Sequence, residues 1–389
     1  MTSATPGAGP ILRVTDLKKH FPVHKGLLSR VVGQVYAVDG VSFEIGRGET
    51  LCLVGESGCG KTTVAKTVMR LLEPTSGTVA LGGADITFLT EAQLRPHRRQ
   101  MQMVFQDPYS SLNPHLSASA IVSEPLTNFD LASGTELHQR VAALFERVGL
   151  RTDATAKYPH EFSGGQRQRL GIARALALNP SLIVADEPVS ALDVSVQAQV
   201  LNLLIDLQEE LGLAYLFVSH DLAVVEHIGH RIAVMYLGRI VELAANADLF
   251  GEPLHPYSEA LLAAAPVPEP GLKRERFIVQ GDVPSPMTPP AGCHFHTRCA
   301  YVQERCRIET PPLTEVKPAH WVACHLRPVG GPFGRLSAGV GSFSRTREPK
   351  AGALGLREKA GDEGAFADPH PNPLPQAVEG AVRQRDGSN

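Results

Sequence analysis

The 389-residue sequence predicts an α/β fold, and three features of the chain support this prediction. A glycine-rich stretch at residues 55–63 lies between an apolar run of strand length and a segment whose apolar residues have helical spacing. Two further apolar runs, at residues 181–185 and 214–218, lead into polar side chains and are separated by a helical pattern. Hydrophobic residues make up 43% of the chain, which is enough for a sizeable core in two or three domains.

Charge and hydropathy narrow the possible function classes. The formal net charge is −3, so no global basic field indicates nucleic-acid binding. No apolar stretch approaches the roughly 18 residues that cross a bilayer. Residues 1–10 are small and polar, so we expect no signal peptide and predict a disordered N-terminus. A cytosolic location is expected, in which the six cysteines would be thiols or metal ligands rather than disulfides.

The glycine-rich stretch has the pattern of a phosphate-binding loop (P-loop). Its residues are Gly55, Glu56, Ser57, Gly58, Cys59, Gly60, Lys61, Thr62 and Thr63. Glycines let backbone N–H groups turn toward phosphate oxygens, and the N-terminus of the following helix adds positive partial charge. Lys61 can reach the β- and γ-phosphates, and the Thr62 hydroxyl can ligate Mg²⁺. With a strand before it and a helix after it, the stretch predicts a nucleoside triphosphate site.

Strand patterns surround this loop, at residues 11–14, 17–21, 35–45, 50–54 and 78–81. Residues 35–45 alternate between apolar and polar side chains, which is typical of a half-buried strand. A turn at residues 46–49 leads into the apolar strand that precedes the loop. These patterns predict a nucleotide-binding core flanked by a small antiparallel sheet.

The middle of the chain is predicted to be mostly helical. An apolar strand ends at Gln106, and the helical pattern runs from about residue 118 to residue 178. Within it lie four consecutive small or polar residues: Ser163, Gly164, Gly165 and Gln166. A serine and two glycines before a helical run form a helix N-terminus suited to an anion.

Two later strands carry polar residues at their ends. Asp186 and Glu187 follow residues 181–185, and His220 follows residues 214–218. Phosphate hydrolysis needs positioning and charge stabilisation more than covalent chemistry. We therefore expect Asp186 to hold Mg²⁺ indirectly or through a water molecule, and Glu187 to be the general base that polarises the attacking water. The alternative is a carboxylate pair that only caps and solvates a strand end.

In this order the motifs resemble the ATP-binding subunit of an ABC transporter, over residues of about 11–255. A P-loop is shared by many NTPases, whereas Ser163–Gln166 between Gln106 and Asp186 is specific to this family. Phe162 departs slightly from the family's usual Leu. The resemblance implies a P-loop NTPase fold: a RecA-like core, an antiparallel β subdomain and an α-helical signature subdomain at about residues 107–178.

The resemblance also implies roles for several residues. Gln106 would contact Mg²⁺ or water and sense the transmembrane partner, and His220 would contact the γ-phosphate. Together with Lys61 and Glu187 these two complete the expected catalytic set.

Other implied roles involve a second ATPase subunit and the adenine ring. Ser163, Gly164, Gly165 and Gln166 would close over nucleotide bound by that subunit, and Asp193 would lie in the loop that crosses the interface. The adenine ring would stack on an aromatic residue before the P-loop, for which Phe21 is the candidate and Tyr36 the rival.

Residues 256–329 resemble the C-terminal extension of oligopeptide, dipeptide and nickel importer ATPases. The proline-containing loop at residues 105–114 and the insertion at residues 25–34 are consistent with that group. The resemblance implies an ATPase that energises a bacterial peptide importer at the cytoplasmic face of the inner membrane. Its partners would be a second ATPase, two permeases and, indirectly, a solute-binding protein. An importer of nickel or another solute is the alternative.

Four cysteines of this extension are Cys293, Cys299, Cys306 and Cys324. In a cytosolic chain they suggest a metal site, although their spacings exceed the Cys-x2-Cys of common zinc sites. Some members of the resembling family carry a four-iron, four-sulfur cluster on this pattern, and four thiolates suit it. Spacing alone leaves the cluster, zinc and unliganded thiols all open.

Two further function classes fit less well. A soluble ABC protein acting on DNA or ribosomes would typically carry coiled-coil insertions or two cassettes, and this chain has one cassette. A degenerate regulatory module would lack a catalytic residue, whereas all four expected ones are present. Residues 330–389 are rich in Gly, Pro and Arg and are predicted to be disordered.

Overall fold

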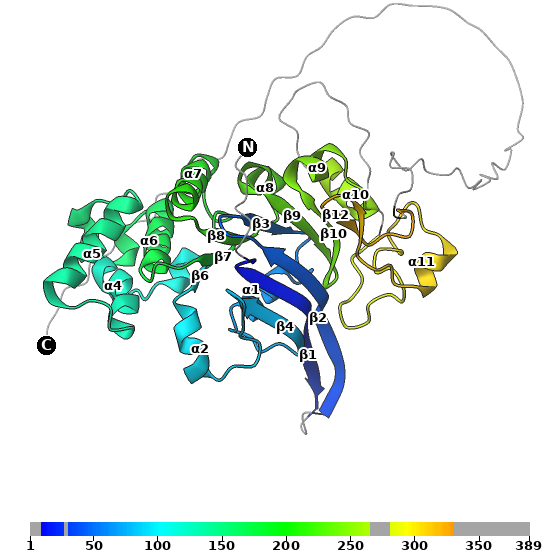
Figure 1. The fold of residues 1–389 in the computed structure, drawn as a ribbon, viewed down its shortest axis with the longest axis horizontal. Coiled ribbons are helices and arrows are strands. Elements are labelled where there is room, and N and C mark those ends of the chain that lie inside the picture. The colour runs from blue at the N-terminus through cyan, green and yellow to red at the C-terminus, as the bar shows by residue number, and fades with distance from the viewer. Residues whose placement is uncertain (1–8, 27–29, 265–280, 328, 330–389) are drawn as a thin grey trace, which may run out of the picture. The chain divides into compact units, whose positions relative to one another are not determined.

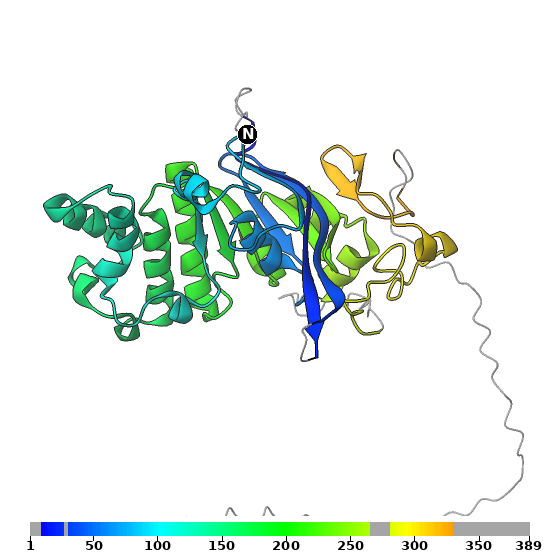
Figure 2. The same ribbon diagram turned by 90° about the horizontal axis from the view of Figure 1, so that it is seen from below.

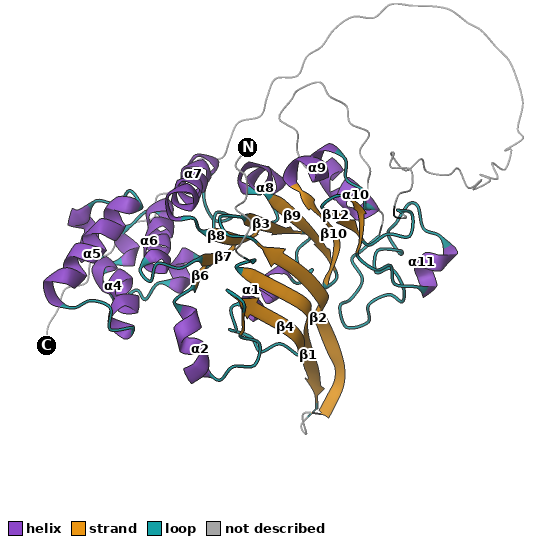
Figure 3. Ribbon diagram, in the orientation of Figure 1, coloured by secondary structure: helices purple, strands orange, loops and turns teal. Residues whose placement is uncertain are grey.

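The computed structural model describes residues 9–26, 30–264, 281–327 and 329. The disorder predicted for residues 330–389 lies outside the described residues, as does that for residues 1–10 except for the last two. Figure 1 and Figure 3 show the two sheets around which the described elements are arranged.

The larger sheet has the strand order β11-β12-β10-β9-β3-β8-β7-β6. Its parallel part consists of β6 (Met101–Val104), β7 (Leu182–Asp186), β8 (Ala214–Val218), β3 (Thr50–Val54) and β9 (Arg231–Tyr236). Antiparallel strands continue it: β10 (Arg239–Ala245), β12 (His320–Val322) and β11 (Thr314–Lys317). Because β11 and β12 follow residue 255, the C-terminal extension builds one edge of the core sheet.

The smaller sheet is the antiparallel sheet that the sequence predicts. Its order is β2-β1-β4-β5. The strands are β1 (Leu12–Lys25), β2 (Arg30–Ile45), β4 (Ser76–Leu81) and β5 (Ala84–Asp85). The long hairpin of β1 and β2 pairs Leu12 with Ile45 at one end and Lys25 with Arg30 at the other.

Alternation along the central strands gives the larger sheet two apolar faces. In β3, Leu51 and Leu53 belong to one core cluster, whereas Cys52 and Val54 belong to another. The first cluster also contains apolar residues of the smaller sheet and of α1 (Lys61–Val68), while the second contains those of α7 (Val194–Leu211) and α8 (Leu222–Ile228). Side chains point alternately to opposite faces of a strand, so continuous apolar runs mark strands covered on both sides.

The predicted helical region begins beyond β6, on the side opposite the extension (Figures 1 and 2). It contains α3 (Pro108–Ser111), α4 (Ala118–Asn128), α5 (Gly134–Arg147) and α6 (Gly164–Leu176), with two short 3₁₀ turns at Thr152–Ala156 and Pro159–Glu161. The remaining helices are α2 (Glu91–Arg98), α9 (Asn246–Gly251), α10 (Pro256–Ala264) and α11 (Glu304–Ile308).

A buried carboxylate joins the extension to the core sheet. Glu242 of β10 accepts hydrogen bonds from the backbone N–H groups of Leu254 and His255, at 2.7 and 2.9 Å. The Nε2 atom of His320, on β12, lies 2.7 Å from the same carboxylate. All three polar partners come from beyond β10, and both Glu242 and His320 are buried. Burying a carboxylate is costly unless it is paired, so these contacts fix the start of the extension.

Because His255 is buried, we expect the protein to lose stability in acid. Burial lowers the pKa of His255 to about 4, against the Coulombic effect of Glu242, which raises it. A histidine of the unfolded chain titrates near pH 6.5, so the unfolded state binds more protons between these values. Above about pH 6.5 the histidine is neutral in both states and costs no stability. As the pH falls toward 4, the free energy of unfolding decreases by an amount on the order of 3 kcal/mol.

Urea unfolding of wild type and of His255→Asn, compared between pH 7 and pH 4.5, measures this decrease. The asparagine variant should lose less stability on acidification than wild type. Replacement of His138, which is exposed on α5, is the matched control and should leave the pH dependence as in wild type. Equal acid sensitivity in wild type and His255→Asn would contradict the assignment.

Candidate nucleotide site

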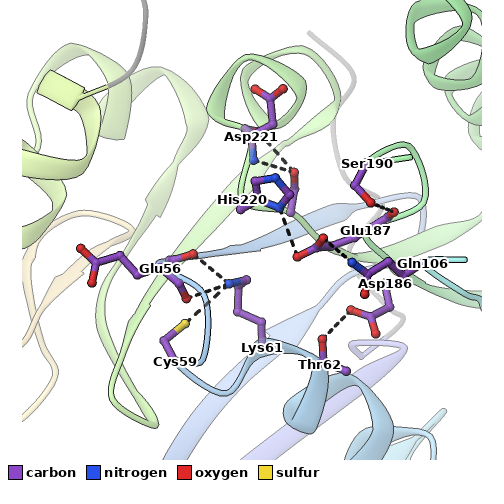
Figure 4. A network of polar contacts seen from close by, with 12 residues as sticks. Glu56, Cys59, Lys61, Thr62, Gln106, Asp186, Glu187, Ser190, His220 and Asp221 are labelled. Atoms are coloured by element: carbon purple, nitrogen blue, oxygen red, sulfur yellow. Dashed lines mark hydrogen bonds and ion pairs between the residues drawn. The ribbon is translucent and has the colours of Figure 1, made fainter. Parts of the chain in front are cut away.

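The P-loop joins the end of β3 to the start of α1 (Figure 4). Lys61 is buried, and its Nζ atom donates to the carbonyl oxygens of Gly55 and Glu56 at 2.8 and 3.0 Å. Gly60 caps α1 with a φ of 107°. A Cβ atom there would lie 2.0 Å from the Ala37 carbonyl oxygen of β2, so only glycine fits this position. The loop is therefore held closely against the smaller sheet, with its lysine turned inward.

A hydroxyl and a carboxylate meet beside this loop. Thr62 Oγ1 donates to Asp186 Oδ1 at 3.0 Å. Burial raises the pKa of Asp186 above its usual range, and the nearby Glu187 acts in the same direction, while the Thr62 hydrogen bond acts against it. Oxygen ligands of this kind are those that Mg²⁺ prefers, and a cation would favour the ionised carboxylate. The residues present therefore fit a magnesium site.

Three neighbouring strands bring Gln106, Glu187 and His220 together (Figure 4). Gln106 Nε2 donates to Glu187 Oε2 at 2.9 Å. On the other side, His220 Nδ1 lies 3.2 Å from Glu187 Oε1. The Glu187 side chain is 15% exposed and that of His220 is 57% exposed. A largely shielded carboxylate thus lies between an amide and an imidazole at the edge of the sheet.

Glu187 has an unusual backbone conformation. Its φ is 46°, in the left-handed region that costs a non-glycine residue roughly 1–2 kcal/mol. Its N–H donates to the Val218 carbonyl oxygen at 3.0 Å. Its own carbonyl oxygen accepts from the N–H and the hydroxyl of Ser190, at 3.3 and 3.1 Å. These bonds hold the strained turn that directs the side chain toward its two partners.

Other predicted site residues lie apart from this group. Ser163 caps α6: its Oγ atom accepts from the Gln166 N–H at 3.3 Å, and Gln166 Oε1 accepts from the Ser163 N–H at 3.0 Å. Asp193 caps α7 by accepting from the Val196 N–H at 3.0 Å. Within the described residues, no hydrogen bond or ion pair joins Ser163, Gln166 or Asp193 to the P-loop.

The two aromatic candidates lie on neighbouring strands of the smaller sheet. Phe21 of β1 pairs with Val35, and its ring has the Lys19 ammonium 4.8 Å from its centroid. Tyr36 of β2 packs edge-on against His20, with ring centroids 4.6 Å apart. Both side chains are half-buried, and each ring has one such neighbour.

The four cysteines of the extension are free thiols in the structure, as are Cys52 and Cys59. Burial, with a smaller contribution from neighbouring cysteines of the set, raises the pKa of Cys299 to about 11 and that of Cys324 to about 12. The backbone N–H of Cys293 donates to the Cys306 carbonyl oxygen at 2.8 Å, which places these two beside each other. Among the described residues, however, no group of three or more His, Cys, Asp or Glu side chains is placed to hold a metal ion.

Two residues in contact with the P-loop were missed by the sequence reasoning. Arg298 forms a double hydrogen bond with the Glu56 carboxylate, and Tyr257 accepts a hydrogen bond from the Glu56 N–H at its hydroxyl. The contacts span 242 and 201 residues of sequence, and neither residue belongs to a motif of the loop. No local pattern could have revealed them.

Comparison with known proteins gives two family matches. Residues 38–190 match the ABC transporter family, and residues 241–306 match the C-terminal region of oligopeptide/dipeptide transporters. A probable peptide ABC transporter ATP-binding protein of Sinorhizobium fredii is 58% identical over 317 residues, which cover 82% of this chain and 90% of that protein. The oligopeptide transport ATP-binding protein AppF of Bacillus subtilis is 53% identical over 319 residues, which cover 81% of this chain and 97% of that protein.

A solved structure is also similar. It is the dimeric structure of an ATP-binding cassette in a post-hydrolysis state, bound to ADP and phosphate. The TM-score is 0.54 and the identity 31%, covering 60% of this chain and 98% of that one. Together with the P-loop and the carboxylates beside it, this likeness defines a P-loop ATPase of the ABC class, whose nucleotide is ATP bound with Mg²⁺.

The chain belongs to the ATP-binding proteins of the oligopeptide/dipeptide ABC transporter family. This confirms the family, the fold class and the ATPase activity that the sequence predicts. Cassettes of this class dimerise and work with transmembrane permeases. The described part of this chain contains no helix with the length and hydropathy of a membrane span.

Proposed function

We propose that this chain hydrolyses ATP to drive the import of dipeptides and oligopeptides through a membrane permease. The observation that carries the ATPase part is the shielded Glu187 carboxylate between Gln106 and His220, beside the P-loop. The match of residues 241–306 to the oligopeptide/dipeptide transporter region supports the substrate class. The two relatives, one named for peptide and one for oligopeptide transport, support it further.

The chemistry assigned to the site follows from its contacts. When bound, Mg²⁺ supplies charge neutralisation at the phosphates, and Thr62, Asp186 and Gln106 are the side chains that would hold it, directly or through water. Glu187 is the proposed general base for the attacking water. His220, which lies 3.2 Å from this carboxylate, would contact the γ-phosphate. Lys61 would exchange its loop carbonyl partners for phosphate oxygens.

A second ATPase subunit would complete the site; we propose a related but non-identical chain, with a second copy of this chain as the alternative. Ser163, Gly164, Gly165 and Gln166 lie at the start of α6, where N–H groups and the helix dipole suit a phosphate. We assign them, with Asp193, to the nucleotide bound by the partner. Phe21 is the proposed adenine-stacking residue. The assembled ATPases would act on two permeases at the cytoplasmic face of the inner membrane, fed by a solute-binding protein.

Glu187→Gln should abolish hydrolysis while sparing nucleotide binding. Glutamine has the same shape but cannot accept a proton, so the rate in the assembled transporter should fall at least about 100-fold. Phosphate release and retention of bound ATP would be measured together. Glu146→Gln, at an exposed position on α5, is the matched control. Hydrolysis at the wild-type rate in the Glu187 variant would refute its role as the base.

Uptake by cells tests the substrate class. Cells carrying wild-type protein or the Glu187→Gln form would be supplied with labelled dipeptides, labelled oligopeptides and Ni²⁺ in separate assays. Because substrate entry depends on hydrolysis, peptide uptake should fall in the variant while Ni²⁺ uptake stays unchanged. Impaired Ni²⁺ uptake with normal peptide uptake would assign the protein to the metal branch of the family.

We also propose that Cys293, Cys299, Cys306 and Cys324 bind a four-iron, four-sulfur cluster. Four thiols in one part of the fold have the donor chemistry for this. Their described positions do not form a metal site, so ligation would require the thiols to converge. No step of ATP hydrolysis is assigned to the cluster.

Anaerobic purification with iron and acid-labile sulfide analysis tests this ligand set. The expected content is about four of each per chain. Cys306→Ser should lower both, whereas Cys52→Ser, at a β3 position outside the set, should lower neither. Zinc in place of iron, or a purified chain without metal, would contradict the cluster.

A further inference from the structure

One ion pair links the C-terminal extension to the P-loop. Arg298 Nη1 donates to Glu56 Oε2 at 2.8 Å, and Nη2 donates to Oε1 at 3.1 Å. This bidentate arrangement matches the planar guanidinium to the carboxylate and is stronger than a single contact. The Arg298 side chain is 8% exposed and that of Glu56 is 30% exposed. Solvent and salt therefore screen the pair less than they screen a surface pair.

The backbone of Glu56 is held as well as its side chain. Its N–H donates to the hydroxyl of Tyr257, from α10, at 2.9 Å. Its carbonyl oxygen accepts from Lys61 Nζ at 3.0 Å. Glu56 thus has three anchored groups, two of which are bound by residues beyond position 255. The conformation of the loop is in this way coupled to the position of the extension.

An aromatic cluster fixes the groups that make these contacts. The ring centroid of Tyr236, on β9, lies 4.8 Å from that of Tyr257 and 5.2 Å from that of Phe295. The Arg298 guanidinium carbon lies 5.8 Å from the Tyr236 ring centroid. All three aromatic side chains are fully buried. Arg298 is therefore attached to a packed part of the protein beside the strand that precedes α1.

The direction of the Glu56 side chain matters for an anionic ligand. Figure 4 shows its carboxylate pointing away from Lys61, outside the turn of the loop. A triphosphate bound by the loop would be repelled by an unpaired carboxylate on the second residue of that loop. Pairing with Arg298 neutralises most of the negative charge of Glu56 and keeps its side chain away from the position of the phosphates.

We propose that Arg298 is a positioning residue for nucleotide binding, through which the C-terminal extension sets the affinity of the P-loop for ATP. It acts by holding the Glu56 carboxylate aside and neutralising it, and it does not itself contact the reacting atoms. The inference rests on the proposed function, because it requires the loop to bind the triphosphate.

Equilibrium binding of methylanthraniloyl-ATP with Mg²⁺ to the full chain tests the proposal. Arg298→Ala should raise the dissociation constant about 10-fold at low salt, because the carboxylate is left unpaired near the phosphates. The difference from wild type should shrink as salt is added. Adding Glu56→Gln to Arg298→Ala should restore most of the affinity, since the repelling charge is then gone. A merely structural arginine would show neither salt sensitivity nor this rescue.

Controls separate the possible outcomes. Arg305→Ala removes an exposed arginine of α11 whose partner is Glu309, and it should bind nucleotide as wild type does. Should Arg298→Ala fail to fold, Arg298→Lys is measured instead. Lysine keeps the charge but not the bidentate contact, so binding should weaken about threefold. Wild-type affinity in the Arg298 variant, or no rescue by Glu56→Gln, would overturn the inference, whereas a wild-type chain that binds no nucleotide would overturn the proposed function.

Discussion

The parallel order of β9, β3, β8, β7 and β6 is the constraint on which the nucleotide site depends. Parallel strands place their carboxyl ends at one edge of a sheet, so the residues that follow them meet there. The P-loop follows β3, Glu187 follows β7, and His220 follows β8. Pairing of Val54 with Val234 and of Asp186 with Val218 sets how far each end extends. A slip of one residue would turn every side chain of a strand to the opposite face, so the burial of both faces also fixes the site.

Much of this arrangement could be predicted because it is local in sequence. Three apolar runs are short enough to be identified as strands from the sequence. The P-loop, the Asp186–Glu187 pair and His220 each come directly after one of them. The hydrogen bond from Gln106 to Glu187 follows once β6 and β7 are neighbours. The left-handed backbone of Glu187 could not be predicted, since its N–H is held by Val218 of the neighbouring strand through a tertiary contact. Sequence periodicity specifies which face is buried, not how a turn is held.

The C-terminal extension shows more clearly what could not be predicted from the sequence. Its cysteine spacing and its family resemblance are visible in the sequence, yet β11 and β12 are short and contain charged and polar residues. Their place in the core sheet depends on the contact between Glu242 and His320, which are 78 residues apart. A buried glutamate in a strand gives no sequence signal of its partner. The prediction of a small appended region therefore did not include the strands by which that region completes the sheet.

The predicted site residues form two sets, one at the edge of the larger sheet and one at the N-termini of α6 and α7, and the two sets have different hydrogen-bond partners. In the single chain, Thr62 is already bonded to Asp186 and Glu187 to Gln106, because one sheet edge supplies all four. Lys61 is bonded to carbonyl oxygens of its own loop. Ser163 and Asp193 instead satisfy the first N–H groups of their own helices. A cap of this kind holds the N-terminus of α6 in the form that an anion requires, without presenting an unsatisfied hydroxyl. Under the proposed assignment, the chain would carry two half-sites, one built on strand ends and one on a helix start. A head-to-tail pair of subunits, as proposed, would let each half-site complete the other.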